Sequence, residues 1–233
     1  MKCKVTNNQL DPFMSFGKMP IANGFIEEKN FSKEFFFNME VGFNQDLSLF
    51  QLNDHPEPNK MFNKDYPFFT GSSEYMKSHF KDYSKFVEKY LKSNPKIIEI
   101  GSNDGTFLKN FNDKSQNIIG FEPSKNIAEK AKENNIPTIN NFFNKKNIKE
   151  LPSNFKNIDL ICASNVICHV PNLNDLIESI DSILPPFAAA EIVVIVGVVD
   201  GNKIWLDEPT ALPAKLKKAG PFPSAPSVTM YET

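Results

Sequence analysis

The stretch KIIEIGSNDGTFLKNF, residues 96–111, decides the fold. An apolar run containing the acid Glu99 leads into a loop of Gly, Ser, Asn and Asp, after which a second apolar series begins. Only 10 of the 233 residues are glycine, yet Gly101 and Gly105 stand close together directly after the predicted strand. Glycine permits tight turns and close approach of a ligand to the backbone, so the loop is either a turn or a binding site.

The segments after residue 96 alternate between short apolar strands and helices. Strands are expected at 96–100, 117–122, 136–140, 158–164 and 191–199, and helices at 105–111, 123–135, 145–151 and 172–184. Strands that are apolar on both sides indicate a parallel sheet with helices on both faces. We therefore expect an α/β fold with a Rossmann-like, doubly wound, mainly parallel sheet.

The rest of the chain predicts two further regions. Residues 1–71 form a small irregular module with one clear strand at 35–43, where apolar and other residues alternate, followed by a Pro-containing connector. A helix capped by Ser72 or Ser73 opens the main domain, 72–200. Residues 201–233 change in composition and predict a hairpin and a Pro-rich tail.

Bulk composition excludes several classes of protein. A net charge of −2 gives no reason to expect binding to nucleic acid or to an anionic membrane. The N-terminus has no apolar run of signal-peptide type, and the apolar segment around Glu191 is too short to span a bilayer. Three cysteines favour a reducing compartment, so we expect a cytoplasmic protein, while the sequence leaves its oligomeric state open.

Polar residues follow successive strands at the edge where parallel sheets bind ligands. The spacing from Gly101 to Gly105 differs from the G-x-G-x-x-G of a dinucleotide site, which favours a smaller zwitterionic ligand over a pyrophosphate. Glu122 lies about twenty residues further on, the separation at which an acid reaches ribose hydroxyls. Phe142 and Phe143 follow the third strand and could form a wall for adenine.

Asn165 and His169 follow the fourth strand at the same edge. Taken singly, Glu122 fits a solvated acid, each phenylalanine fits a core position, and His169 fits a structural histidine equally well. As an ordered set, these residues predict a pocket for S-adenosylmethionine.

The sequence also resembles a known family. IIEIGSNDGTFL (97–108) is similar to the first motif of class I methyltransferases, and more narrowly of the C-methyltransferases that act on nucleotide-linked deoxysugars. Four other segments resemble that family: GKMPIANGF, MFNKDYPFFTGSSEYMKSHF, GFEPSKNIAEKAKENNIPTINNFF and ASNVICHVPNLNDLIESI. The resemblance runs from about residue 3 to about residue 184.

This resemblance implies S-adenosylmethionine as methyl donor, S-adenosylhomocysteine as product, and a nucleoside-diphosphate keto-sugar as acceptor, methylated at carbon. The cofactor-binding candidates are Glu99, Gly101, Ser102, Asn103, Asp104, Gly105, Glu122, Pro123, Phe142, Phe143 and Asn165. Tyr66 and His169 align with family positions near the active site and are the candidate catalytic residues.

The chain departs from the family at two places. The family's N-terminal module usually binds a structural zinc through two Cys pairs, and the corresponding positions here are Cys3, Thr6, Asn44 and Leu47. A closed zinc site needs four N or S ligands, so we expect no zinc. The second departure follows Leu184, where the family's further catalytic motif and C-terminal domain have no match.

Three functions remain in view. The first is a methyltransferase (EC 2.1.1 type) in deoxysugar biosynthesis. The second is a truncated, catalytically silent module that binds S-adenosylmethionine, or a half-protein that needs a separate C-terminal partner. The third is a nucleotide-sugar or NAD-binding protein, which the missing third glycine of the dinucleotide fingerprint disfavours.

Overall fold

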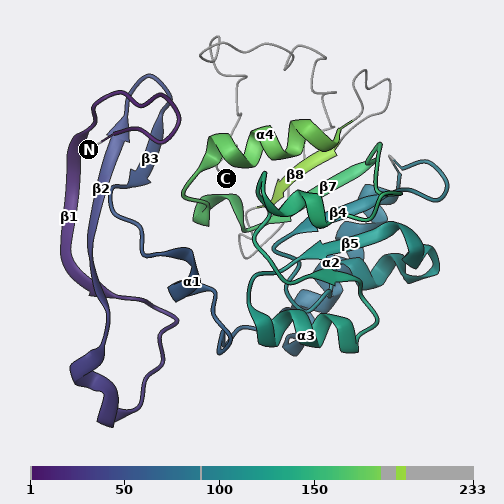
Figure 1. Ribbon diagram of the computed structural model, residues 1–233, viewed down its shortest axis with the longest axis horizontal. Coiled ribbons are helices and arrows are strands. Elements are labelled where there is room, and N and C mark those ends of the chain that lie inside the picture. Colours follow the sequence, from purple (N-terminus) through teal and green to yellow (C-terminus); the bar gives the residue numbers. More distant parts are fainter. Residues whose placement is uncertain (1, 90, 185–192, 198–233) are drawn as a thin grey trace.

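Figure 1 shows a computed structural model with two parts, an antiparallel sheet and a larger α/β part, linked by a connector that contains α1 (Pro58–Met61). The structure describes residues 2–89, 91–184 and 193–197. The predicted hairpin and tail at 201–233 lie outside the described residues. Of the strand predicted at 191–199, the described part is β8 (Val193–Gly197).

The larger part contains a five-stranded sheet in which every neighbouring pair is parallel. Its order is β6-β5-β4-β7-β8, formed by β4 (Ile97–Ile100), β5 (Ile118–Phe121), β6 (Thr138–Ile139), β7 (Leu160–Ser164) and β8. The first strand of this sheet along the chain, β4, therefore lies centrally, and the order reverses between β4 and β7. This confirms the predicted Rossmann-like fold and fixes the point at which such sheets bind ligands.

Helices cover both faces of this sheet. One buried cluster joins it to α2 (Glu74–Glu88), the 3-10 helix η3 (Leu108–Asn117) and α3 (Lys125–Glu133). A second cluster on the opposite face includes α4 (Leu173–Ile183) and residues of the 3-10 helix η4 (Asn147–Glu150). Phe121, Ile98 and Ile161 are completely buried at the centre of the second cluster.

Local sequence explains where these helices begin and which side they bury. Ser73 is the N-cap of α2, where its hydroxyl oxygen accepts a hydrogen bond from the Met76 N–H at 3.3 Å. Helix α2 packs on the core through Phe80, Tyr83 and Val87. In α4, Leu176 and Ile180 are buried against the sheet, whereas Ile177 is 45% exposed.

The N-terminal part is an antiparallel sheet of three strands in the order β1-β2-β3. They are β1 (Asp11–Pro20), β2 (Phe36–Asn44) and β3 (Leu49–Leu52), with the 3-10 helix η1 (Glu28–Lys33) between the first two. The single strand predicted here corresponds to β2, so the prediction missed β1 and β3. Large apolar side chains stay exposed on this sheet, among them Phe13 at 60% and Phe50 at 55%.

The three cysteines are free thiols in different environments. Cys162 is completely buried in β7, and burial raises the pKa of its thiol well above the usual value, which keeps the thiol neutral. Cys168, in contrast, is exposed. Within the described ranges, no helix is both long enough and apolar enough to cross a bilayer.

Candidate functional site

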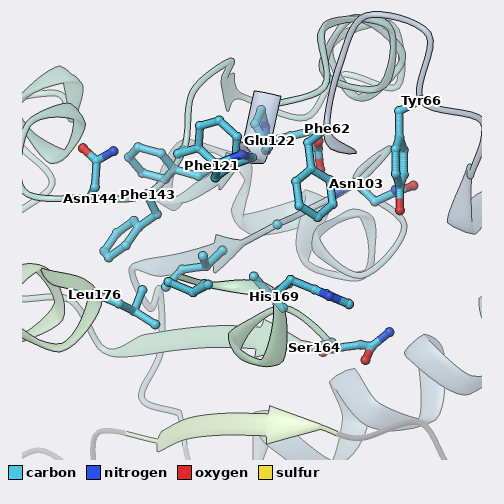
Figure 2. A pocket seen from close by; sticks show the side chains of 18 of the residues that line it. Phe62, Tyr66, Asn103, Phe121, Glu122, Phe143, Asn144, Ser164, His169 and Leu176 are labelled. Atoms are coloured by element: carbon cyan, nitrogen blue, oxygen red, sulfur yellow. The ribbon is translucent and has the colours of Figure 1, made fainter. Parts of the chain in front are cut away.

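A cavity of about 560 Å³ opens at the carboxyl edge of the parallel sheet, next to the reversal between β4 and β7. Figure 2 shows side chains converging on it from the strand ends and from the connector. Its size lies within the range of small-molecule sites. Nine of the predicted site residues line it: Tyr66, Gly101, Asn103, Glu122, Pro123, Phe142, Phe143, Asn165 and His169.

The glycine loop, residues 101–105 after β4, holds its two glycines in a backbone conformation that residues with a Cβ rarely adopt. Gly101 has φ +66° and Gly105 has φ +79°, both in the left-handed region. A Cβ on Gly105 would lie 2.7 Å from Cγ1 of Ile136, and one on Gly101 would overlap the side chain of Val166. The loop is thus a tight turn, and its first glycine also lines the cavity.

Glu122, at the end of β5, presents a fixed carboxylate at the cavity. One oxygen accepts a hydrogen bond from the Asn103 N–H at 3.1 Å, and the other accepts one from the Ser124 N–H at 2.7 Å. The residue is 5% exposed, and burial raises the pKa of its carboxyl although these hydrogen bonds lower it in part. A carboxylate held in this way can still accept hydrogen bonds from hydroxyl groups of a ligand.

Two residues of the glycine loop bind the connector. Asn103 accepts a hydrogen bond from the Thr70 N–H at 2.8 Å and donates one to the carbonyl of Phe68 at 3.1 Å. Asp104 accepts a hydrogen bond from the Gly71 N–H at 2.8 Å. The connector is therefore held against the cavity as one of its walls.

Four predicted cofactor-binding residues lie outside the lining of the cavity: Glu99, Ser102, Asp104 and Gly105. Ser102, Asp104 and Gly105 are buried within the loop itself. Glu99 is 3% exposed, and burial, followed by the charges of Asp104 and Glu122, raises the pKa of its carboxyl well above the usual value. Its place in β4 puts it on the sheet face that packs against Tyr83 of α2 and Cys162.

The two predicted aromatic residues have different surroundings. Phe142 is half-buried and lines the cavity, so it is placed as a wall for a planar ligand group. Phe143 is 8% exposed and its ring packs edge-on against Phe121, with centroids 5.1 Å apart, so much of its surface belongs to the core.

Sequence analysis missed a central aromatic residue of the cavity, Phe62 of the connector. Its ring centroid lies 5.6 Å from Tyr66, 6.3 Å from Phe142 and 6.2 Å from His169. The Pro-containing connector has no helical or strand period, so periodicity gave no signal that Phe62 would face a site, although Phe62 belongs to a segment that resembles the family. Phe68, Ser164 and Asp175 also line the cavity and were not predicted.

The two catalytic candidates lie at the cavity in different surroundings. Burial and then the charge of Glu122 raise the pKa of the Tyr66 phenol, so at neutral pH it can donate a hydrogen bond but is not a ready base. His169 ends the 3-10 helix η5 (Ile167–His169), and its ring is exposed. Exposure leaves the imidazole accessible to a ligand.

The positions that correspond to the zinc ligands of the resembling family come together in space. The Thr6 and Asn44 side chains hydrogen-bond the buried Cys3 thiol, and Asn44 Oδ1 accepts a hydrogen bond from the Leu47 N–H at 3.0 Å. One thiol, a hydroxyl, an amide and an aliphatic side chain do not fit a closed zinc site, which needs four N or S ligands. Among the described residues, no group of three or more His, Cys, Asp or Glu is arranged to bind a metal.

Comparison with known proteins adds two family matches. Residues 73–215 match a family model described as a methyltransferase domain, and residues 3–62 match one described as a zinc binding domain. The C-methyltransferase NovU of Streptomyces niveus is 23% identical over 176 residues, which is 74% of this chain. The chain spans 42% of the length of that relative.

Two solved structures show partial likeness. A protein from Pyrococcus horikoshii OT3, PH0226, has a TM-score of 0.46 at 19% identity, covering 55% of this chain and 61% of its own. A SAM-dependent methyltransferase from Thermotoga maritima has a TM-score of 0.39 at 23% identity, covering 52% of each chain.

Proposed function

The chain belongs to the family defined by the methyltransferase domain, and from this premise we propose that it is an S-adenosylmethionine-dependent methyltransferase whose donor binds in the cavity. The observation that carries the proposal is the buried Glu122 carboxylate, which two backbone N–H groups fix at the cavity wall. It would accept hydrogen bonds from the ribose hydroxyls, with Phe142 along the adenine ring. Gly101 and Asn103 would face the methionine moiety.

For the acceptor, we propose a nucleoside-diphosphate keto-deoxysugar that is methylated at carbon. The likeness to a C-methyltransferase supports this choice. When bound, the donor supplies an electrophilic methyl group. A base must remove the proton beside the sugar carbonyl, and the electron pair left on carbon forms the new C–C bond while the S–CH3 pair returns to sulfur.

His169 is the candidate base, since its exposed imidazole lies at the cavity among the described residues. Tyr66 is the candidate donor of a hydrogen bond to the sugar carbonyl oxygen, because its raised pKa keeps the phenol protonated. Both roles require the acceptor to enter between the connector and η5, where the two rings flank Phe62.

Calorimetric titration with S-adenosylhomocysteine tests the donor site. The wild-type chain should bind it, and Glu122→Gln should weaken binding by about tenfold, because an amide accepts hydroxyl hydrogen bonds less strongly than a carboxylate. Glu129→Gln, on the exposed side of α3, is the matched control and should bind like the wild type. A wild-type titration without heat would exclude the proposal.

A second candidate function is a donor-binding module that does not itself transfer a methyl group. It is favoured by the two catalytic candidates themselves, because the raised pKa of Tyr66 disfavours its phenol as a base and His169 is exposed to solvent. Methyl-labelled donor separates the two candidates when it is incubated with a panel of nucleotide-linked keto-sugars. Label in the sugar identifies the enzyme, whereas donor binding without labelled product identifies the module.

A further inference from the structure

The charged groups that line the cavity have one sign. Among the described lining residues the ionisable acids are Glu122 and Asp175, and none is a lysine. The chain contains no arginine, so its basic side chains are lysines and three histidines, of which His169 lines the cavity. Carboxylates and aromatic rings favour a cationic group of a ligand over a neutral one where they face it.

Aromatic rings line the cavity around Phe62, where they could contact a positive charge on a ligand. Phe62 is in ring contact with Tyr66, Phe142 and His169 at centroid distances of 5.6, 6.3 and 6.2 Å. Figure 2 shows its ring pointing into the cavity toward His169. Phe62 thus joins the wall expected to contact adenine to the groups expected to face the acceptor.

Covalent connectivity of the donor restricts where its sulfur can lie. The sulfur is bonded both to the ribose side, expected at Glu122, and to the methionine side, expected at Gly101. Asn103, two residues after Gly101, binds Glu122 through its N–H, while its side chain holds Phe68 and Thr70 of the connector beside them. The connector that carries Phe62 therefore covers the interval in which the sulfur must lie.

We propose that Phe62, with Tyr66 beside it, forms a cation-recognising wall that makes the site discriminate between the sulfonium donor and its neutral thioether product. This inference rests on the proposed function. When the methyl group leaves, the electron pair of the S–CH3 bond stays on sulfur and the positive charge is lost. Attraction between the sulfonium and the ring faces and carboxylates is lost with it, which favours release of the product.

The test is a ratio of two affinities, measured by calorimetry on the full chain with S-adenosylmethionine and S-adenosylhomocysteine. Phe62→Leu keeps an apolar side chain of similar size but removes the ring face. It should weaken binding of S-adenosylmethionine by about fivefold and that of S-adenosylhomocysteine by less than about twofold. Phe62→Tyr retains a ring face and should keep the wild-type ratio, as rescue by a conservative variant.

Phe142→Leu is the matched control. Both ligands carry the same adenine, so this variant should weaken both to the same extent and leave the ratio unchanged. If Phe62→Leu also weakens both equally, or changes neither, the inference is overturned while the proposed function stands. If neither ligand binds the wild type, both the inference and the proposed function are overturned. Phe62→Met, which also lacks a ring, serves in the same comparison should Phe62→Leu fail to fold.

Discussion

The two sheets of this protein bury their strands to very different degrees. Every residue of β4 and β5 is buried, whereas every residue of β1 except Pro20 is exposed. Helices cover both faces of the parallel sheet, while the N-terminal sheet relies on hydrogen bonds and a few ring contacts. Gln51 illustrates this, since it accepts a hydrogen bond from the Lys4 N–H and donates one to the Lys2 carbonyl, each at 3.0 Å.

This difference indicates that the two sheets are stabilised in different ways. In the parallel sheet the hydrophobic effect dominates, because large side chains are removed from water on both faces. In the N-terminal sheet, ring pairs such as Phe13 with Phe50, at 5.2 Å between centroids, remain half in solvent. Substitutions of equal chemistry should therefore have unequal effects in the two sheets.

The largest effect is expected in the core of the parallel sheet. Ile161→Ala in β7 removes a completely buried side chain and should lower the free energy of unfolding by about 3–4 kcal/mol. Phe50→Ala in β3, although it deletes more atoms, should cost less than about 1 kcal/mol because the ring is 55% exposed. Urea denaturation measures both. An equal cost at Phe50 would contradict the comparison and show that the N-terminal sheet is covered in solution.

A second experiment would replace the hydrogen bonds around Cys3 in the N-terminal module by a bound zinc ion. Thr6→Cys, Asn44→Cys and Leu47→Cys, made together, would place four thiolates with Cys3 at one point. With free zinc at a hundred times its Kd, the variant should gain about 2.7 kcal/mol, seen as a zinc-dependent rise in Tm. The same three positions changed to Ser form the control. Stoichiometric zinc in the purified wild type would contradict the assignment of these positions as a lost metal site.

The third comparison uses two glycines, Gly17 and Gly101, that have nearly the same φ angle. Gly17 in β1 has φ +72° and a Cβ there would meet nothing within 4 Å, whereas at Gly101 it would overlap Val166. Gly17→Ala should cost about 1 kcal/mol for the left-handed backbone alone. Gly101→Ala should cost about 2 kcal/mol and also abolish binding of S-adenosylhomocysteine. Thermal unfolding and calorimetry check these values, and intact ligand binding in Gly101→Ala would argue against the loop as part of the site.

The parallel sheet could be predicted from sequence because its strands and helices have strong local patterns. Apolar runs, the cap at Ser73 and the glycine loop each act within a few residues of the chain. Strand β1 could not be found in this way. Its pairing with β2 joins residues as far apart as Asp11 and Phe43, and its side chains are exposed on both faces, so no alternation marks it.

The same reason explains which site residues were found. Glu122 and Phe142 follow strands, so the topology of a parallel sheet places them at the cavity. Phe62 comes from an irregular connector whose path depends on hydrogen bonds to Asn103 and Asp104, some 33 to 35 residues away along the chain. Glu99 was assigned to the site from its motif, but the alternation of β4 directs it to the opposite face of the sheet from Ile98 and Ile100.

The hydrogen bonds between the connector and the glycine loop couple the order of residues 68–71 to the occupancy of the cavity. A ligand that orders Asn103 must also order Phe68 and Thr70, which share its side chain. Linkage is reciprocal, so a partner that restrains residues 68–71 and a ligand that orders Asn103 would change each other's affinity by the same factor. Protease cleavage or amide exchange in residues 68–71 would consequently report occupancy of the site without any label on the ligand.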